Sequence, residues 1–208
     1  MLVTLGIIGV VSAMTVPSLI QNHQRQAYVT RLHKVYNLIQ QAVMQYLTDR
    51  NALNLKEAGI TSLSAVDDWA KTYFKIVQDC GTDGSDCFAV GEYRKMDGKA
   101  MNLFIRQDCM YYVLADGSAI AFVYQYNGIQ VNIDINGKKG PNIVGRDVFP
   151  LMIYNDGTVD DSNDKNTPPP YTSEQREEVF NNTCNNGANP NWWGCTGKII
   201  NDGWQMTY

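Results

Sequence analysis

Oxygen-bearing side chains gather in one short stretch of the sequence, residues 134–147. They are Asp134, Asn136, Asn142 and Asp147. Carboxylate and amide oxygens are the ligands that Ca²⁺ prefers, so this stretch is a candidate calcium site and Ca²⁺ is the one cofactor that the sequence suggests. In the alternative, structural interpretation, Asn136 and Gly137 form a turn and Asp134 accepts hydrogen bonds from backbone N–H groups. We favour the structural interpretation because the two lysines that follow the turn would repel a cation.

Five cysteines supply the other candidate chemistry. Cys80 and Cys87 enclose one short polar loop, and Cys184 and Cys195 enclose another. A zinc site is disfavoured because the sequence has no Cys-x-x-Cys pair and no Cys/His cluster. We expect the disulfides Cys80–Cys87 and Cys184–Cys195, and hence an oxidising compartment, with reduced thiols as the alternative. Cys109 lies in an apolar run and is expected to be a buried odd cysteine.

Catalytic motifs are missing from the sequence. The two histidines, His23 and His33, have no matched serine or cysteine nucleophile nearby, and neither a G-x-S-x-G nor a glycine-rich phosphate-binding motif occurs. The formal net charge of −4 offers no basic surface to nucleic acid. We therefore expect a protein that is not an enzyme and does not bind nucleic acid, with both histidines on a solvated helix face.

The elements that would position these residues begin with a strongly apolar segment, residues 1–24, which carries no formally charged side chain. At a helical rise of about 1.5 Å per residue, twenty residues reach about 30 Å, the hydrocarbon thickness of a bilayer. A cleaved signal peptide is disfavoured because no basic residue precedes the apolar run. We predict that residues 1–24 form a transmembrane half of a longer helix, and a plain membrane anchor is the alternative.

The apolar pattern then narrows to one face over residues 25–51. The stripe consists of Tyr28, Leu32, Val35, Tyr36, Ile39, Val43, Tyr46 and Leu47. Its i, i+3, i+4, i+7 spacing is typical of an amphipathic helix, so one helix of about fifty residues is expected. Pro17 should kink or locally unwind that helix. Gly6 and Gly9 place small residues near one face, where neighbouring helices could approach closely.

The rest of the sequence predicts a globular head, residues 25–208, of the α+β class. In the connecting region, residues 53–98, Ser64 is expected to cap a helix with Asp67 and Asp68 in its first turn, followed by a polar loop, Asp79–Asp86. Residues 101–154 should form a four- to five-stranded antiparallel sheet packed on the amphipathic half of the long helix. The expected strands are Met101–Ile105, Met110–Leu114, Ala119–Tyr124, Ile129–Ile135 and Val148–Tyr154, and the fourth of these is expected to be half-buried.

The last part of the chain, residues 155–208, is expected to be a variable loop and a C-terminal segment. Residues 155–173 are rich in Asp and Pro and poor in apolar side chains, which indicates a solvated loop. Trp204, Met206 and Tyr208 alternate, so the end of the chain should dock as a strand or as an extended segment.

The N-terminal residues also resemble a known family. The run Met1–Ala13, followed by Met14–Pro17, is similar to the N-terminal helix of type IV pilins and type II secretion pseudopilins, and Pro17 falls where that family carries a helix-breaking proline. Asp134–Asp147 resembles a loop common in pilin-like proteins, and Cys195–Trp204 resembles their C-terminal ending. The family's basic leader, N-terminal Phe and following Glu are missing here, so we expect the natural start to lie upstream of Met1.

This resemblance implies a pilin-like fold, with a long N-terminal helix on an antiparallel sheet and disulfide-linked loops. It implies a structural subunit of a type IV pilus-like or type II secretion pseudopilus filament, assembled through the apolar N-terminal helix. The implied partners are pilin-like subunits in a homo- or hetero-filament, a prepilin peptidase and an assembly platform. The implied location is the bacterial inner membrane, with the head in the periplasm or outside the cell. A minor pilin, a tip adhesin or another ligand-binding module in the envelope is the alternative.

Overall fold

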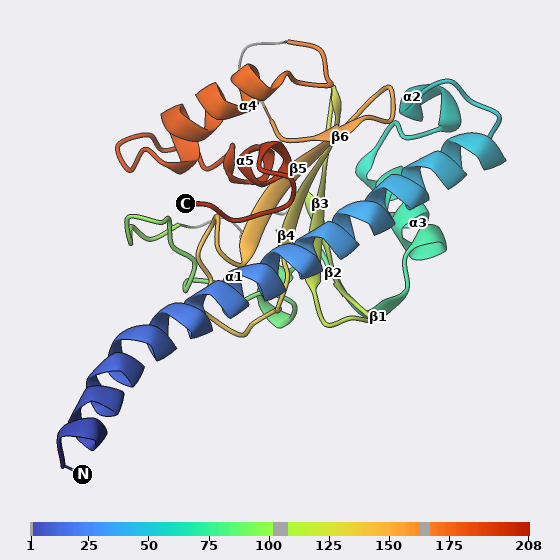
Figure 1. Ribbon diagram of the computed structural model, residues 1–208. Coiled ribbons are helices and arrows are strands. Elements are labelled where there is room, and N and C mark those ends of the chain that lie inside the picture. Colours follow the sequence, from blue (N-terminus) through green and yellow to red (C-terminus); the bar gives the residue numbers. More distant parts are fainter. Residues whose placement is uncertain (1, 102–107, 163–166) are drawn as a thin grey trace.

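The computed structural model describes the backbone of residues 2–101, 108–162 and 167–208, and the side chains of those residues except 2–12 and 14. One long helix lies across a twisted antiparallel sheet, and its N-terminal part projects beyond the rest of the molecule (Figure 1). In the sequence, short helices precede and follow the strands of the sheet. The α+β class expected from the sequence is confirmed.

Helix α1 spans Leu2–Asp49 and contains Pro17. The helix continues through the proline, so the local unwinding expected there is absent. Pro17 removes only one backbone hydrogen bond, and a helix can accommodate that loss by bending. The projecting part of α1 is visibly curved (Figure 1).

The sheet has six strands in the order β1-β2-β3-β4-β5-β6, each antiparallel to its neighbour. The strands are β1 (Ile76–Gly81), β2 (Cys109–Leu114), β3 (Ala119–Gln125), β4 (Gly128–Asp134), β5 (Val148–Tyr154) and β6 (Val159–Asp160). The four- to five-stranded sheet expected from the sequence is therefore too small. Strand β6 was expected to be a loop, and β1 extends into the expected loop Asp79–Asp86. The expected strand Met101–Ile105 lies largely outside the described residues.

The described part of the head also contains six short helical segments: α2 (Leu55–Ala58), α3 (Leu63–Tyr73), η1 (Gly84–Asp86), α4 (Ser173–Val179), the π-helical turn η2 (Phe180–Cys184) and α5 (Cys195–Asn201). The expected helix after residue 60 exists, but its cap is Ser62 and not Ser64. The Ser62 hydroxyl accepts a hydrogen bond from the Ala65 backbone N–H at 3.2 Å, and neither Asp67 nor Asp68 lies in the first turn. This earlier start places Val66 and Trp69 on the buried face.

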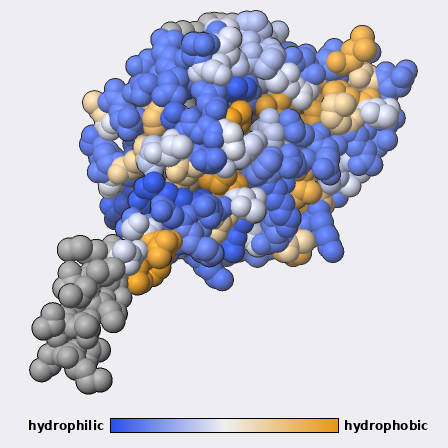
Figure 2. Space-filling model, in the orientation of Figure 1, coloured by the Kyte–Doolittle hydropathy of each residue, from blue (hydrophilic) through white to orange (hydrophobic). Residues whose placement is uncertain are grey.

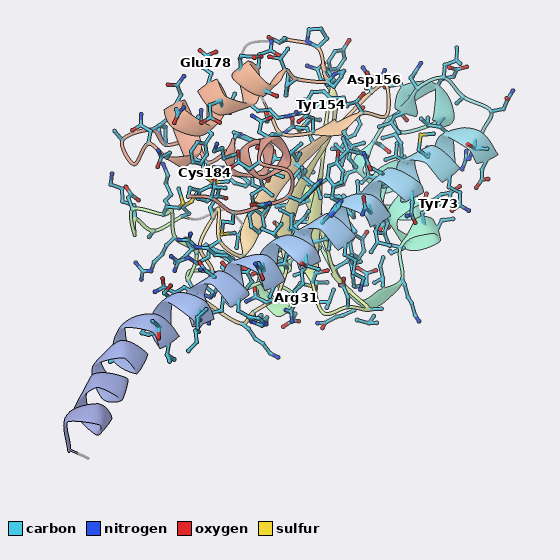
Figure 3. All side chains as sticks on the ribbon, viewed as in Figure 1. Arg31, Tyr73, Tyr154, Asp156, Glu178 and Cys184 are labelled. Carbon is cyan, nitrogen blue, oxygen red and sulfur yellow. A yellow bond between two sulfur atoms is a disulfide. The ribbon has the colours of Figure 1, made fainter. Side chains whose placement is uncertain are left out.

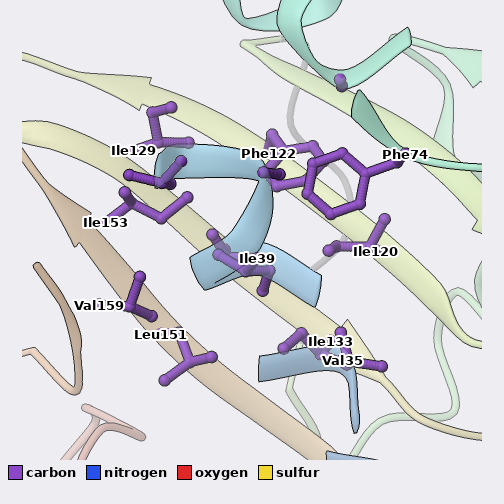
Figure 4. Packing of buried hydrophobic residues seen from close by; sticks show 14 of the residues in the cluster. Val35, Ile39, Phe74, Ile120, Phe122, Ile129, Ile133, Leu151, Ile153 and Val159 are labelled. Carbon is purple, nitrogen blue, oxygen red and sulfur yellow. The ribbon is translucent and has the colours of Figure 1, made fainter. Parts of the chain in front are cut away.

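The amphipathic half of α1 packs on one face of the sheet, as the stripe of residues 25–51 predicts. Leu32, Val35, Ile39 and Val43 are completely buried. Figure 4 shows Val35 and Ile39 among side chains from β3, β4 and β5, including Ile133 and Leu151. Burial of each such side chain contributes about 1.5–3 kcal/mol, so this half of the helix is firmly attached to the head.

The opposite face of the sheet is also covered. A second apolar cluster joins Phe88, Tyr93, Phe180 and both cysteines of the second disulfide to β2, β3 and β5. Strand β4 is consequently buried along its whole length, so the prediction of a half-buried strand is wrong. The buried polar side chains of β4 form hydrogen bonds with one another and with β3. Gln130 Oε1 accepts a hydrogen bond from Gln125 Nε2 of β3 at 2.7 Å, and Gln130 Nε2 donates to Asn132 Oδ1 at 3.1 Å.

Both expected disulfides are present, Cys80–Cys87 and Cys184–Cys195. Cys184, labelled in Figure 3, lies at the end of η2, and its partner begins α5. Cys109 belongs to neither disulfide and is buried, as expected. The end of the chain docks on the head without forming a strand. There the Trp204 ring stacks on the His33 ring of α1, with centroids 3.9 Å apart.

Candidate functional site

The projecting part of α1 exposes apolar side chains beside the head. Val16, Leu19 and Ile20 are 48%, 66% and 53% exposed, and their i, i+3, i+4 spacing places them on one side of the helix. Figure 2 shows a hydrophobic patch at the point where the helix leaves the head. Apolar patches of this kind on soluble surfaces commonly mark contact with a membrane or another protein.

Only part of the expected membrane segment can be compared with the structure. Among the residues that the structure describes, no helix contains a stretch apolar and long enough to cross a membrane. The backbone of Gly6 and Gly9 belongs to α1, but the surroundings of residues 1–12 and Met14 lie outside the described side chains. The close helix approach expected at these two glycines stays a prediction.

Polar contacts hold the second half of α1 to the head. The Tyr36 hydroxyl donates to the Val159 carbonyl at 3.0 Å, and the Tyr46 hydroxyl donates to the Ala58 carbonyl at 2.8 Å. His23 is exposed, as the sequence predicts. His33 is partly buried beneath Trp204, so its expected position on a freely solvated face is wrong. Helix, sheet and C-terminal segment are thus one connected body.

The four predicted oxygen ligands do come together in the loop that joins β4 to β5. Asp147 Oδ2 accepts the Asn142 backbone N–H at 2.8 Å, and its Oδ1 accepts the Ile143 N–H at 2.7 Å. Asp134 Oδ1 accepts the Asn136 backbone N–H at 3.2 Å, while Asn136 Nδ2 donates to the Gly140 carbonyl at 3.2 Å. Both carboxylates are completely buried. The loop is therefore folded around two acidic side chains.

Burial governs the charge of this pair. Desolvation raises the pKa of Asp134 to about 7, against the opposing effect of the Tyr93 hydroxyl, which donates to Oδ2 at 2.7 Å. Desolvation likewise raises the pKa of Asp147, although the N–H groups of Ile143 and Asn142 lower it. A buried carboxyl with no cationic partner tends to keep its proton.

These bonds bear on the calcium hypothesis. Each oxygen of Asp147 already accepts one backbone N–H, Oδ1 that of Ile143 and Oδ2 that of Asn142. The amide oxygens of Asn136 and Asn142 are buried and have no partner among the described residues. No group of three or more His, Cys, Asp or Glu residues in the described chain is placed to hold a metal ion. The backbone N–H donors on both Asp147 oxygens favour the structural interpretation.

A polar cleft of about 540 Å³ lies between α1 and this loop. It is lined by Gln21, Gln24, Arg25, Tyr28, Gly140, Pro141 and Arg146. The sequence interpretation missed it because its two walls are far apart in the chain. One signal was present: Arg25 is the first charged residue after the uncharged segment 1–24.

A second acidic cluster lies where the sequence predicted a solvated loop. Asp160 and Asp161 are each only 1% exposed. Arg176 Nη2 donates to Asp160 Oδ2 at 2.7 Å. Asp161 accepts the backbone N–H groups of Gly194 and Gly197, and its complete burial raises its pKa to about 6. The prediction of a solvated segment is therefore wrong at these two residues, which fix the C-terminal helices to the edge of the sheet.

The sequence was also compared with known proteins. No curated protein and no solved structure matches the chain. The model of a family of unknown function, DUF6613, matches residues 18–208. Because this match covers most of the 208 residues, the chain belongs to the DUF6613 family.

Proposed function

We propose that the protein is a structural subunit of a filament outside the cytoplasm, of the type IV pilus or type II secretion pseudopilus kind. In this proposal the N-terminal part of α1 is held in the inner membrane before assembly and packs against the same segment of neighbouring subunits afterwards. The head, residues 25–208, stays in water. The role is structural and not catalytic.

One observation carries this proposal: the two halves of α1 have different environments. From Val29 to Tyr46 the apolar stripe is buried on the sheet. From residue 13 to residue 24 the described side chains are exposed, Leu19 and Ile20 among them. Leaving apolar side chains in water is unfavourable by about 25 cal/mol per Å², so the projecting half requires a partner that the head does not supply.

The resemblance of residues 1–17 to the pilin helix supports a membrane and then sister helices as that partner. The arrangement of the head agrees with it, because a long N-terminal helix packed on an antiparallel sheet is the fold that the resemblance implies. The two disulfides favour an oxidising compartment outside the cytoplasm.

Co-purification with surface filaments tests the proposal. Filaments sheared from cells should contain the protein, and replacing Gly6 or Gly9 with Leu should remove it from them, because bulk at a close helix crossing separates the backbones. The folded head, judged by its circular dichroism and melting temperature, should be unchanged. Absence of the wild-type protein from both the membrane fraction and the filaments would disprove the proposal.

A ligand-binding role at a filament tip is the second candidate, and one feature favours it. Trp192 and Trp193 stack on each other with ring centroids 5.1 Å apart and an interplanar angle of 16°. Both rings are partly exposed, in the loop that the Cys184–Cys195 disulfide closes. Stacked aromatic rings make a rigid platform for a ligand at low entropic cost. Low copy number in filaments, together with adhesion that is lost in Trp192→Ala, would favour this role over that of a major subunit.

A further inference from the structure

The cleft between α1 and the Gly140–Arg146 loop lies at the junction between the projecting helix and the head. Arg25 and Tyr28 line it from the helix, and Arg146 lines it from the loop. Burial is the main cause that raises the pKa of Tyr28; the charge of Asp147 adds to this effect, and the charge of Arg146 opposes it. A volume of about 540 Å³ is typical of a small-ligand site.

Among the described residues, the two arginines of this cleft have no acidic partner in an ion pair. None of the lining residues is acidic, and neither Arg25 nor Arg146 forms an ion pair within the described part of the chain. Lys138 and Lys139 are exposed in the same loop, just before Gly140. Basic side chains elsewhere in the protein form ion pairs with carboxylates; for example, Lys71 pairs with Asp67 and Asp79. The cleft is therefore positively charged. Figure 2 shows a strongly hydrophilic surface beside the apolar patch where α1 leaves the head.

The position of the cleft along the helix defines what it would meet. Arg25 follows the exposed Ile20 by five residues, which is about 8 Å along the helix axis. The headgroup layer on each side of a bilayer is about 5–8 Å thick, from the difference between its total and its hydrocarbon thickness. If Ile20 marks the hydrocarbon boundary, Arg25 lies at the depth of the lipid phosphates, where Tyr side chains are also favoured.

We propose that this cleft binds the phosphate of an anionic phospholipid in the membrane from which α1 emerges. Arg25 and Arg146 would contact the phosphate from opposite walls, and the amides of Gln21 and Gln24 would add hydrogen bonds. This inference rests on the proposed function, because it requires the projecting helix to be in a bilayer. Its consequence is that the head is held at a defined orientation on the membrane before assembly.

Lipid retention by the full chain tests the inference. The protein is reconstituted into nanodiscs of equal phosphatidylglycerol and phosphatidylcholine, released into mild detergent, and the retained lipids are counted by native mass spectrometry. The wild type should retain phosphatidylglycerol in preference to phosphatidylcholine. Each of R25Q and R146Q should lower this preference about fivefold, the effect of one basic side chain at an anionic surface. The double variant R50Q/K56Q, beyond the far end of α1, removes as much charge as R25Q/R146Q and should keep the preference.

Three results would overturn the inference. One is insertion of the wild type with no preference between the two lipids, and that result would leave the filament proposal intact. A second is release of phosphatidylglycerol by millimolar inorganic phosphate, which would indicate a site for free anions. The third is that R25Q/R146Q lowers cross-linking between copies of the chain and not lipid retention, which would assign the cleft to a neighbouring subunit. Failure of the wild type to insert at all would instead contradict the proposed function itself.

Discussion

Arg176 donates two parallel hydrogen bonds to Asp160, from Nε to Oδ1 at 2.9 Å and from Nη2 to Oδ2 at 2.7 Å. The pair joins α4 to β6, which are separated in sequence by the segment that the sequence predicts to be solvated. Asp160 is 1% exposed and also accepts the Tyr171 backbone N–H at 3.0 Å. This buried pair therefore fixes the C-terminal helices to the edge of the sheet.

Removing the guanidinium should strongly destabilise the head. In Arg176→Ala the Asp160 carboxylate stays buried without its cation, a change that costs about 3–5 kcal/mol. Lys71→Ala breaks two exposed pairs, with Asp67 and Asp79, and should cost at most about 1 kcal/mol for each. Urea denaturation followed by circular dichroism measures both changes, and equal losses in the two variants would refute the importance of the buried pair.

Stability should fall as the pH rises through the range in which Asp134 titrates. Its pKa is about 7 in the folded protein and about 4 in an unfolded chain. Between these values the folded state keeps the proton and the unfolded state releases it, so the free energy of unfolding decreases with pH, by on the order of 4 kcal/mol in total. Asp134→Asn should have a smaller slope between about pH 4 and about pH 7. An unchanged slope in this variant would show that Asp134 ionises normally in the folded protein.

Calcium should leave the melting temperature unchanged, because both oxygens of Asp147 already accept backbone N–H groups. Thermal unfolding in the presence of Ca²⁺ and then of EGTA measures this directly. A calcium-dependent rise in melting temperature that disappears in Asp147→Asn would revive the calcium site at Asp134, Asn136, Asn142 and Asp147. In that case the buried amide oxygens of the two asparagines would be additional ligands.

The structure leaves no space for a side chain at Gly194, in the C-terminal segment. Its φ is +95°, and a Cβ would lie 2.6 Å from the backbone nitrogen of Phe180. Gly91 has a similar φ of +86°, but a Cβ added there would have no atom within 4 Å. The Gly91→Ala variant therefore measures the cost of backbone strain alone. Gly91→Ala should cost about 1–2 kcal/mol, and Gly194→Ala clearly more, because its backbone neighbour must move. Equal melting temperatures of the two variants would contradict this packing.

Local patterns predicted the elements whose determinants are close together in sequence. The stripe from Leu32 to Val43 specified the buried face of α1, and Asp116-Gly117 marked the β2–β3 hairpin. The two disulfides followed from short loops between paired cysteines. These features depend on helical or strand periodicity and on turn chemistry, which a single sequence displays directly.

The errors occurred where distant segments meet. Asp160 and Asp161 look solvated in their local sequence, and only folding brings Arg176 and the N–H of Gly194 to them. The edge strand β1 has few buried side chains, so it lacks the alternation of a half-buried strand. The cleft at Arg25 and Arg146 could not be predicted either, because its walls come from α1 and from the β4–β5 loop.

Photo-cross-linking in cells tests the central claim, that the projecting half of α1 packs against its counterpart in other subunits. A photoreactive amino acid replaces Leu19, which is 66% exposed on the projecting helix, or Leu53, which is 86% exposed at the far end of the head. Both proteins are irradiated in intact cells and their sizes are compared by immunoblot. The account predicts covalent dimers and larger multimers from position 19 and monomers from position 53. Monomers alone from position 19, in a protein that is folded and present in the cell envelope, would contradict it.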